Sequence, residues 1–78
     1  MTQLVDLPLG RESRVVRVTG NDEITLRLLE MGLTPGIEVR LIGRAPLGDP
    51  LEFEVRGYRL SIRKSEAARV EIEGDGSP

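Results

Sequence analysis

The stretch LRLLEMGLTPG, residues 26–36, predicts a short helix that stops abruptly and leads into a strand. Gly32 follows the last apolar helical position, where the chain must adopt a left-handed conformation that glycine reaches at low cost. Pro35 has no amide proton to continue the helix, and Pro35-Gly36 suits the centre of a type II turn. This combination of stop and turn is typical of a small β-barrel and does not resemble an active site.

The predicted helix has one apolar face. Ile24, Leu28 and Met31 recur at the i, i+4 and i+7 spacing of a buried helical stripe. Asn21 or Asp22 precedes the helix as its N-cap. Leu29 lies beside the buried face, so we expect it to be partly exposed.

Segments on both sides of the helix predict β-strands. Residues 37–42, 51–56 and 59–63 alternate apolar with polar side chains, residues 13–19 are β-branched, and residues 70–72 form a last short strand. A type II′ turn at Gly57-Tyr58, with Arg56 opposite Arg59, places the apolar residues of both flanking strands on one face. A second rigid corner lies at residues 45–50, APLGDP.

The fold class that follows is mainly β: a small, partly open SH3-like barrel of about five antiparallel strands with one short α-helix between strands 1 and 2. Leu4, Leu7 and Leu9 are expected to cover one end of the barrel, and Ser65 to cap a single helical turn at 65–68. Residues 1–74 form one domain and residues 75–78 a flexible C-terminal tail. An edge strand at 69–73 would permit weak homo-oligomerisation.

The composition excludes several classes of function. The chain has 78 residues and no histidine or cysteine, so the usual ligands of zinc and transition metals and the usual catalytic nucleophile pairs are missing. We therefore predict no catalytic residues, no metal site and no cofactor. The net charge of −2 argues against nucleic-acid binding. No apolar run or leader pattern indicates membrane insertion or export, so the predicted location is cytoplasmic.

The order of these motifs, from about Leu7 to Ile72, closely resembles the FeoA family of bacterial ferrous-iron transport proteins. The resemblance is carried by LP-x-G at 7–10, by L-x-EMGL-x-PG at 28–36, by APLGDP at 45–50 and by RGY-x-LSIR-x-SEA at 56–67. Each motif is weak alone, but their spacing together is specific.

The resemblance implies an SH3-like, stand-alone, non-enzymatic accessory. Its implied partner is the cytosolic region of FeoB, the membrane ferrous-iron transporter, through the G-protein domain or a membrane-proximal part. A similar domain occurs at the C-terminus of iron-dependent DtxR-type repressors, but this chain has no helix-turn-helix.

Two sets of residues are candidates for special roles. The glycines and prolines of the turns form a structural motif that defines the fold: Gly32, Pro35, Gly36, Gly48, Pro50 and Gly57. Side chains expected at corners or beside the helix form the candidate partner-binding set: Leu29, Leu33, Leu47, Tyr58 and Arg59. The structural alternative is that Leu33 closes the helix stop and Leu47 packs across the barrel end.

The charged residues leave further alternatives open. Arginines 27, 44, 56, 59 and 63 either pair with Glu52, Glu54 and Glu66, or one of them acts as an arginine finger on the transporter's GTP hydrolysis. A weak Fe²⁺ carrier would use oxygen ligands from Asp49, Glu52, Glu54 or Asp75. An RNA-binding role conflicts with the charge balance.

Overall fold

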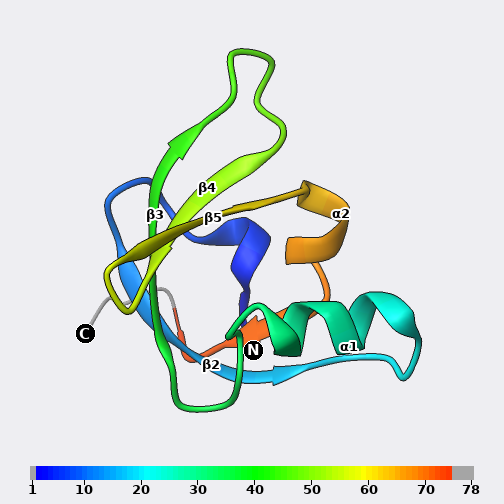
Figure 1. Cartoon of the computed structure of the whole chain (residues 1–78). Coiled ribbons are helices and arrows are strands. Elements are labelled where there is room, and N and C mark those ends of the chain that lie inside the picture. The colour runs from blue at the N-terminus through cyan, green and yellow to red at the C-terminus, as the bar shows by residue number, and fades with distance from the viewer. Residues whose placement is uncertain (1, 75–78) are drawn as a thin grey trace.

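The computed structural model describes residues 2–74, which fold into one curled antiparallel sheet with two short helices and a 3₁₀ turn (Figure 1). The strands follow the order β1-β6-β2-β3-β4-β5 across the sheet. In chain order the elements are β1 (Thr2–Gln3), η1 (Leu4–Asp6), β2 (Glu12–Val18), α1 (Glu23–Glu30), β3 (Glu38–Arg44), β4 (Leu51–Val55), β5 (Tyr58–Ile62), α2 (Lys64–Ala67) and β6 (Val70–Ile72).

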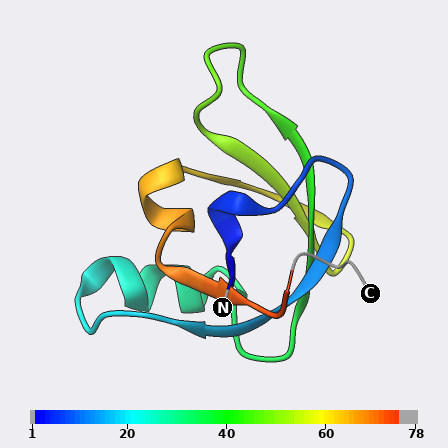
Figure 2. The same ribbon diagram turned by 180° about the vertical axis from the view of Figure 1, so that it is seen from behind.

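The sheet closes around a single apolar core. Figures 1 and 2 show η1 inside the curl of the sheet, α2 at its side after the end of β5, and α1 running along β2. Phe53 is the largest fully buried side chain. The alternating residues predicted to face inward are buried on β3 and β4, which confirms the mainly β barrel and the helix between the first two long strands. The core consists of Leu4, Leu7, Val15, Leu28, Leu33, Ile37, Val39, Leu41, Leu51, Phe53, Val55, Ile62, Ala67, Val70 and Ile72.

Helix α1 ends as the sequence predicts. Gly32 has φ +106°, and its amide donates to the Leu29 carbonyl at 3.0 Å. The Leu33 amide donates to the Leu28 carbonyl at 3.2 Å, which completes a Schellman motif. Leu33 is fully buried against this last turn. Its role is therefore to close the helix stop, the structural alternative, and it is not available to a partner.

The turn between β4 and β5 differs from the prediction. Arg56 and Gly57 occupy its two central positions, with φ +51° and +84°, so Val55 pairs with Tyr58. Two positive φ angles define a type I′ turn, in which the glycine takes the second central position, whereas the predicted type II′ turn has glycine at the first. The predicted pairing of Arg56 with Arg59 is wrong. The error leaves the buried face unchanged, because it shifts β5 by two residues and side chains alternate with period two.

The sheet edges also differ from the prediction. The N-terminal residues add β1 as a sixth strand, which pairs with β6, so β6 lies between β1 and β2 and is not an edge. The strands at the two ends of the sheet are β1 and β5. The prediction that residues 69–73 form an edge strand is therefore wrong. The predicted tail at 75–78 lies outside the described residues.

Two local expectations at the barrel end are wrong. Leu9 is 56% exposed, whereas Leu4 and Leu7 are buried as predicted. Helix α2 begins at Lys64, with Arg63 as its N-cap, so Ser65 does not cap it. The Arg63 amide donates to Glu66 Oε1 at 3.2 Å and the Lys64 amide to Asp49 Oδ1 at 3.0 Å. A loop residue distant in sequence thus supplies part of the cap.

Candidate partner-binding surface

The β3–β4 hairpin projects from the body of the barrel (Figure 1). Its tip is a tight turn in which the Gly48 amide donates to the Ala45 carbonyl at 2.7 Å, with Gly48 at φ +87°. Leu47 stands at this turn and is 96% exposed. The alternative that Leu47 packs across the barrel end is therefore excluded. An almost fully exposed leucine on a rigid turn is a candidate contact for a partner.

Tyr58 holds the β4–β5 hairpin against the end of α1. Its hydroxyl donates to the Met31 carbonyl at 2.8 Å, while 43% of the residue remains exposed. A Cβ at Gly32 would lie 2.3 Å from the Tyr58 hydroxyl oxygen. Gly32 is thus required twice, for its positive φ and for the close approach of Tyr58.

Leu29 lies beside an exposed apolar neighbour, Leu26, which is not among the predicted contact residues. Leu26 is 57% exposed, and both leucines line a shallow hollow at the start of α1, with Asp22 and Glu23 at its rim. Leu29 itself is half-buried. The signal for Leu26 was present in the sequence: it is an apolar helix residue outside the stripe formed by Ile24, Leu28 and Met31.

Most of the arginines face solvent. Among the five arginines considered for cross-sheet pairs, only Arg27 forms an ion pair within residues 2–74, with Glu66, and this pair joins α1 to α2. Arg59 is exposed on β5 opposite Glu54, without an ion pair in the described part of the chain. Arg56, Arg59 and Arg63 are therefore available to a binding partner.

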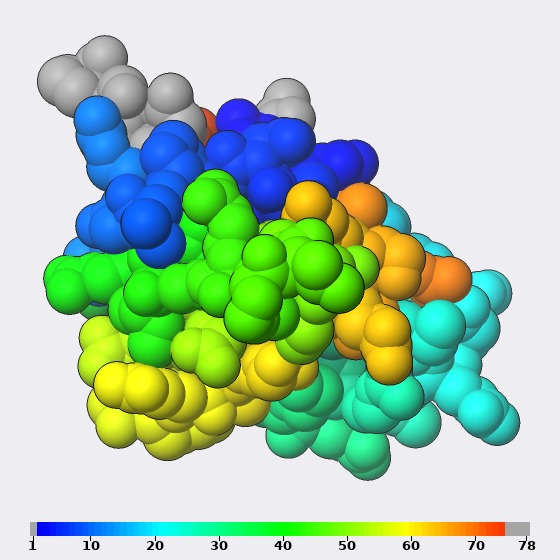
Figure 3. Space-filling view, turned by 90° about the horizontal axis from the view of Figure 1, so that it is seen from above, coloured from blue at the N-terminus to red at the C-terminus, as the bar shows by residue number. Residues whose placement is uncertain are grey.

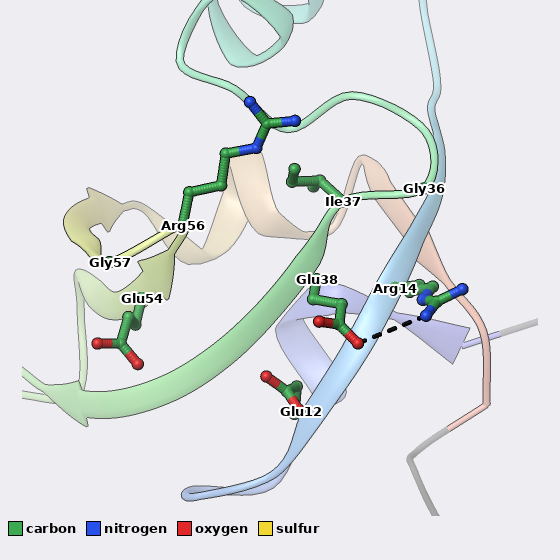
Figure 4. Close-up of a pocket in the computed structure, with 8 residues that line it drawn as sticks. All are labelled: Glu12, Arg14, Gly36, Ile37, Glu38, Glu54, Arg56 and Gly57. Atoms are coloured by element: carbon green, nitrogen blue, oxygen red, sulfur yellow. Dashed lines mark ion pairs between the residues drawn. The ribbon is translucent and has the colours of Figure 1, made fainter.

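A polar hollow of about 440 Å³ lies between the start of β2 and the β4–β5 turn (Figure 4). Arg14 pairs with Glu38 at 3.6 Å along one wall, and Arg56 extends away from Glu54 toward the segment that joins α1 to β3. No group of three or more carboxylates is placed to hold a metal ion among residues 2–74. The proposed iron ligand Asp75 lies outside the described residues.

Among the acids of residues 2–74, Asp22 alone has a strongly shifted pKa, and its role is structural. Asp22 Oδ1 accepts a hydrogen bond from Arg69 Nη1 at 2.7 Å and from the Thr25 amide at 3.2 Å. The Arg69 hydrogen bond, followed by that from Thr25, lowers the pKa of Asp22 from 3.8 to about 2. Asp22 therefore caps α1, ties it to the chain before β6, and stays ionised at neutral pH.

The candidate residues lie in three separate places. Leu47 is at the projecting tip, Tyr58 and Arg59 begin β5, and Leu29 is on α1 with Leu26. Among residues 2–74, no helix is long and apolar enough to cross a membrane.

The FeoA domain model matches residues 2–74 of this sequence. This chain belongs to the FeoA domain family. A Fe(2+) transport protein A/Fe(2+) transporter FeoB fusion protein of Porphyromonas gingivalis is 35% identical over 71 residues. That match spans 91% of this chain but only 8% of the fusion protein, so the chain corresponds to a small part of that relative.

Solved FeoA structures have the same fold. FeoA of Stenotrophomonas maltophilia in complex with zinc, described as a prokaryotic SH3 domain protein, is 36% identical with a TM-score of 0.85, over 97% of this chain and 94% of that one. This similarity confirms the predicted SH3-like fold. IdeR of T. acidophilum, 21% identical with a TM-score of 0.78 over 91% of this chain and 32% of that one, shares the fold alone.

Proposed function

We propose that this FeoA-family chain is a cytoplasmic, non-enzymatic accessory of ferrous-iron uptake. It binds the cytosolic region of the Fe²⁺ transporter through protein–protein contacts and regulates that transporter. The residues that make the contact are exposed side chains on the rim of the barrel, first among them Leu47.

The fusion protein of Porphyromonas gingivalis carries this proposal. A polypeptide that joins a FeoA-like segment to a transporter keeps the two at a high effective concentration, which favours their association without any added contact. A separate FeoA chain must reach the same encounter through its own affinity. It therefore needs a surface with exposed anchors.

The projecting hairpin provides such an anchor. Leu47 presents an apolar side chain that the barrel does not use, and its turn is held by backbone hydrogen bonds, so little conformational entropy is lost when it is buried by a partner. Leu26 and Leu29 offer a second apolar position on α1. Tyr58 and Arg59 lie on β5, where an aromatic and an arginine are typical of binding hot spots.

A pull-down with the transporter's complete cytosolic region, with and without a GTP analogue, tests the proposal. We expect binding, and Leu47→Ala should weaken it by roughly fivefold to thirtyfold, the effect of removing a hot-spot side chain. Leu9→Ala is the matched control, because Leu9 is also exposed but lies outside the candidate set. It should bind as the wild type does.

The possible outcomes test the proposed function and the proposed contact residue, Leu47, separately. Binding that depends on the nucleotide would identify a regulator of the transporter's G-protein cycle, and nucleotide-independent binding would identify a stabilising or assembly role. Equal binding by the Leu47 and Leu9 variants would overturn the assignment of Leu47. A wild-type chain that fails to bind under both conditions would overturn the proposed contact with the cytosolic region.

A further inference from the structure

Strand β5 has one open edge. It ends the sheet order, with β4 as its only paired strand among the described residues. Hydrogen-bonded and non-hydrogen-bonded pairs alternate along an antiparallel ladder, and in a two-residue hairpin the pair beside the turn is hydrogen-bonded. Because that pair is Val55–Tyr58, the amides and carbonyls of Arg59 and Ser61 point away from β4. They form the open edge.

The outer face along this edge carries two arginines. Arg59, Ser61 and Arg63 alternate with the inward-facing Leu60 and Ile62 and are all exposed. Neither arginine has an ion pair within residues 2–74. A shallow groove continues from the end of β5 toward α1, and it is lined by Arg27, Met31, Pro50, Ser61, Arg63 and Glu66.

The surface beside this edge is shared by three elements. Figure 3 shows the β4–β5 hairpin (yellow), α1 (teal) and α2 (orange) meeting on one face. The Tyr58 hydroxyl is hydrogen-bonded to the carbonyl of Met31, which also lines the groove, so the start of β5 already contacts the end of α1. The candidate edge therefore lies at Arg59 and beyond.

A second copy of the chain is a poor occupant of this edge. Antiparallel pairing of two β5 strands centred on Ser61 places Arg59 of each copy opposite Arg63 of the other. Like charges directly opposite one another on a sheet are destabilising, and charged side chains at an edge are a common device against self-pairing. An occupant with acidic side chains at these positions is attracted instead.

Strand β4 shows what kind of sequence suits β5. Its sequence, LEFEV, places Leu51, Phe53 and Val55 in the core, with Glu52 opposite Ser61 and Glu54 opposite Arg59 on the outer face. A strand added to the other side of β5 meets the same alternation of basic outer and apolar inner positions. Acidic residues outside and apolar residues inside are therefore the complementary pattern.

We propose that the open edge of β5 binds an extended acidic segment of a partner protein as an added β-strand. Backbone hydrogen bonds to Arg59 and Ser61 supply affinity, and carboxylates facing Arg59 and Arg63 supply specificity. This inference rests on the proposed function only in so far as the transporter carries such a segment. The experiment below uses no transporter, so the two can fail separately.

A fluorescein-labelled peptide of sequence LEFEV flanked by glycines is the probe, and LKFKV with the same flanks is its control. Fluorescence anisotropy with the full chain should show binding of the acidic peptide only, weakening as salt rises toward about 0.15 M because the paired charges are exposed. Hydrogen exchange measured by NMR should show new protection of the Arg59 and Ser61 amides. The amides of Leu60 and Ile62, already bonded to β4, should change little.

Two variants locate the site. Arg59→Glu should weaken binding roughly tenfold, because an attractive cross-strand pair becomes repulsive. Arg11→Glu carries the same charge change at an exposed arginine outside β5 and should leave binding unchanged. Ser61→Pro removes an amide that faces the open edge without removing a bond to β4, and it should abolish binding. If the new carboxylate beside Glu54 loosens the hairpin, Arg59→Gln provides the same test with a smaller loss.

Several results would overturn the proposal. Equal binding of the acidic and lysine peptides would remove the charge specificity. Protection of the Thr2 and Gln3 amides in place of Arg59 and Ser61 would move the site to the opposite sheet edge, β1. Peptide-independent protection of β5 that increases with chain concentration would identify a second copy as the occupant.

Discussion

The two hairpins that share β4 are built differently at their ends. The β3–β4 hairpin ends in a turn closed by backbone hydrogen bonds, with Leu47 exposed at the tip, and Asp49 at the base of this turn accepts a hydrogen bond from the Lys64 amide of α2. The β4–β5 hairpin returns toward the body of the protein, where Tyr58 binds the carbonyl at the end of α1. The β3–β4 hairpin therefore offers a free apolar side chain at its tip, whereas the β4–β5 hairpin is anchored to α1 beside its turn and offers a strand edge.

Of the two hairpins, the β4–β5 hairpin should lose more stability when the residues at its end are substituted. Gly32→Ala forces a Cβ into a left-handed position and into the place of the Tyr58 hydroxyl. We expect the free energy of unfolding to fall by about 2 kcal/mol, from backbone strain together with the displaced hydrogen bond. Urea unfolding followed by circular dichroism measures this loss.

A double variant separates the two causes. In Tyr58→Phe the hydroxyl is gone, and the next tyrosine atom, Cζ, lies 3.7 Å from the added Cβ, an ordinary contact distance. Gly32→Ala should therefore cost less in the Tyr58→Phe background than in the wild type. An unchanged cost would show that the backbone conformation alone requires Gly32.

Tyr58→Phe on its own tests the hydrogen bond that anchors the hairpin. The bond is partly exposed, so we expect a loss of about 0.5–1 kcal/mol in the free energy of unfolding. Hydrogen exchange should become faster at the start of β5 and stay the same at the β3–β4 tip. Equal acceleration in both hairpins would contradict the distinction between them.

The Asp22–Arg69 ion pair holds the N-terminal end of α1. Its contribution to stability depends on pH, unlike that of the Tyr58 hydrogen bond. The folded pKa of Asp22, about 2, lies below its ordinary value of 3.8, so the unfolded chain takes up the proton first as the pH falls. This contribution to stability is present above about pH 4 and is lost as the pH falls toward 2.

Asp22→Asn should flatten this part of the stability profile, so the difference between variant and wild type should shrink as the pH approaches 2. Thermal unfolding at a series of pH values measures it. Added salt should reduce the difference at neutral pH, because the pair is exposed. A difference that stays constant across this pH range would show that the Asp22 charge does not contribute.

Substitution of Leu47, at the tip of the β3–β4 hairpin, should have the smallest effect on stability. Leu47→Ala removes no contact within the barrel, so the free energy of unfolding should stay within about 0.5 kcal/mol of the wild type. Any loss of partner binding by this variant then reports the contact itself. A drop in stability above that range would show that the tip packs on the barrel in solution.

Part of this fold could be read from the sequence because its signals are local. The Schellman stop at Gly32, the turn at Pro35-Gly36 and the Asp22 cap each depend on residues within one or two turns of the chain. The inward face of β4 and β5 was also predicted correctly despite the wrong turn, because strand alternation survives a shift of two residues. Membership of the FeoA family followed from the order of these same motifs.

The features that were missed depend on contacts between distant residues. The pairing of Thr2 with Ile72 makes β1 a strand, and it places β6 inside the sheet. Part of the cap of α2 comes from Asp49 in the β3–β4 loop, and Ser65 does not cap the helix. No local pattern encodes either contact, since each exists only once the barrel has closed.

The sequence by itself determined the elements, the stop of the helix, the buried faces and the family. Only the tertiary structure decided that Leu33 is buried, that Tyr58 reaches the end of α1, that Leu47 is exposed, and that β5 is an open edge. The physical reason is one of range. Backbone propensity and side-chain periodicity act over a few residues, whereas exposure and edge position depend on which strands meet when the sheet curls around its core.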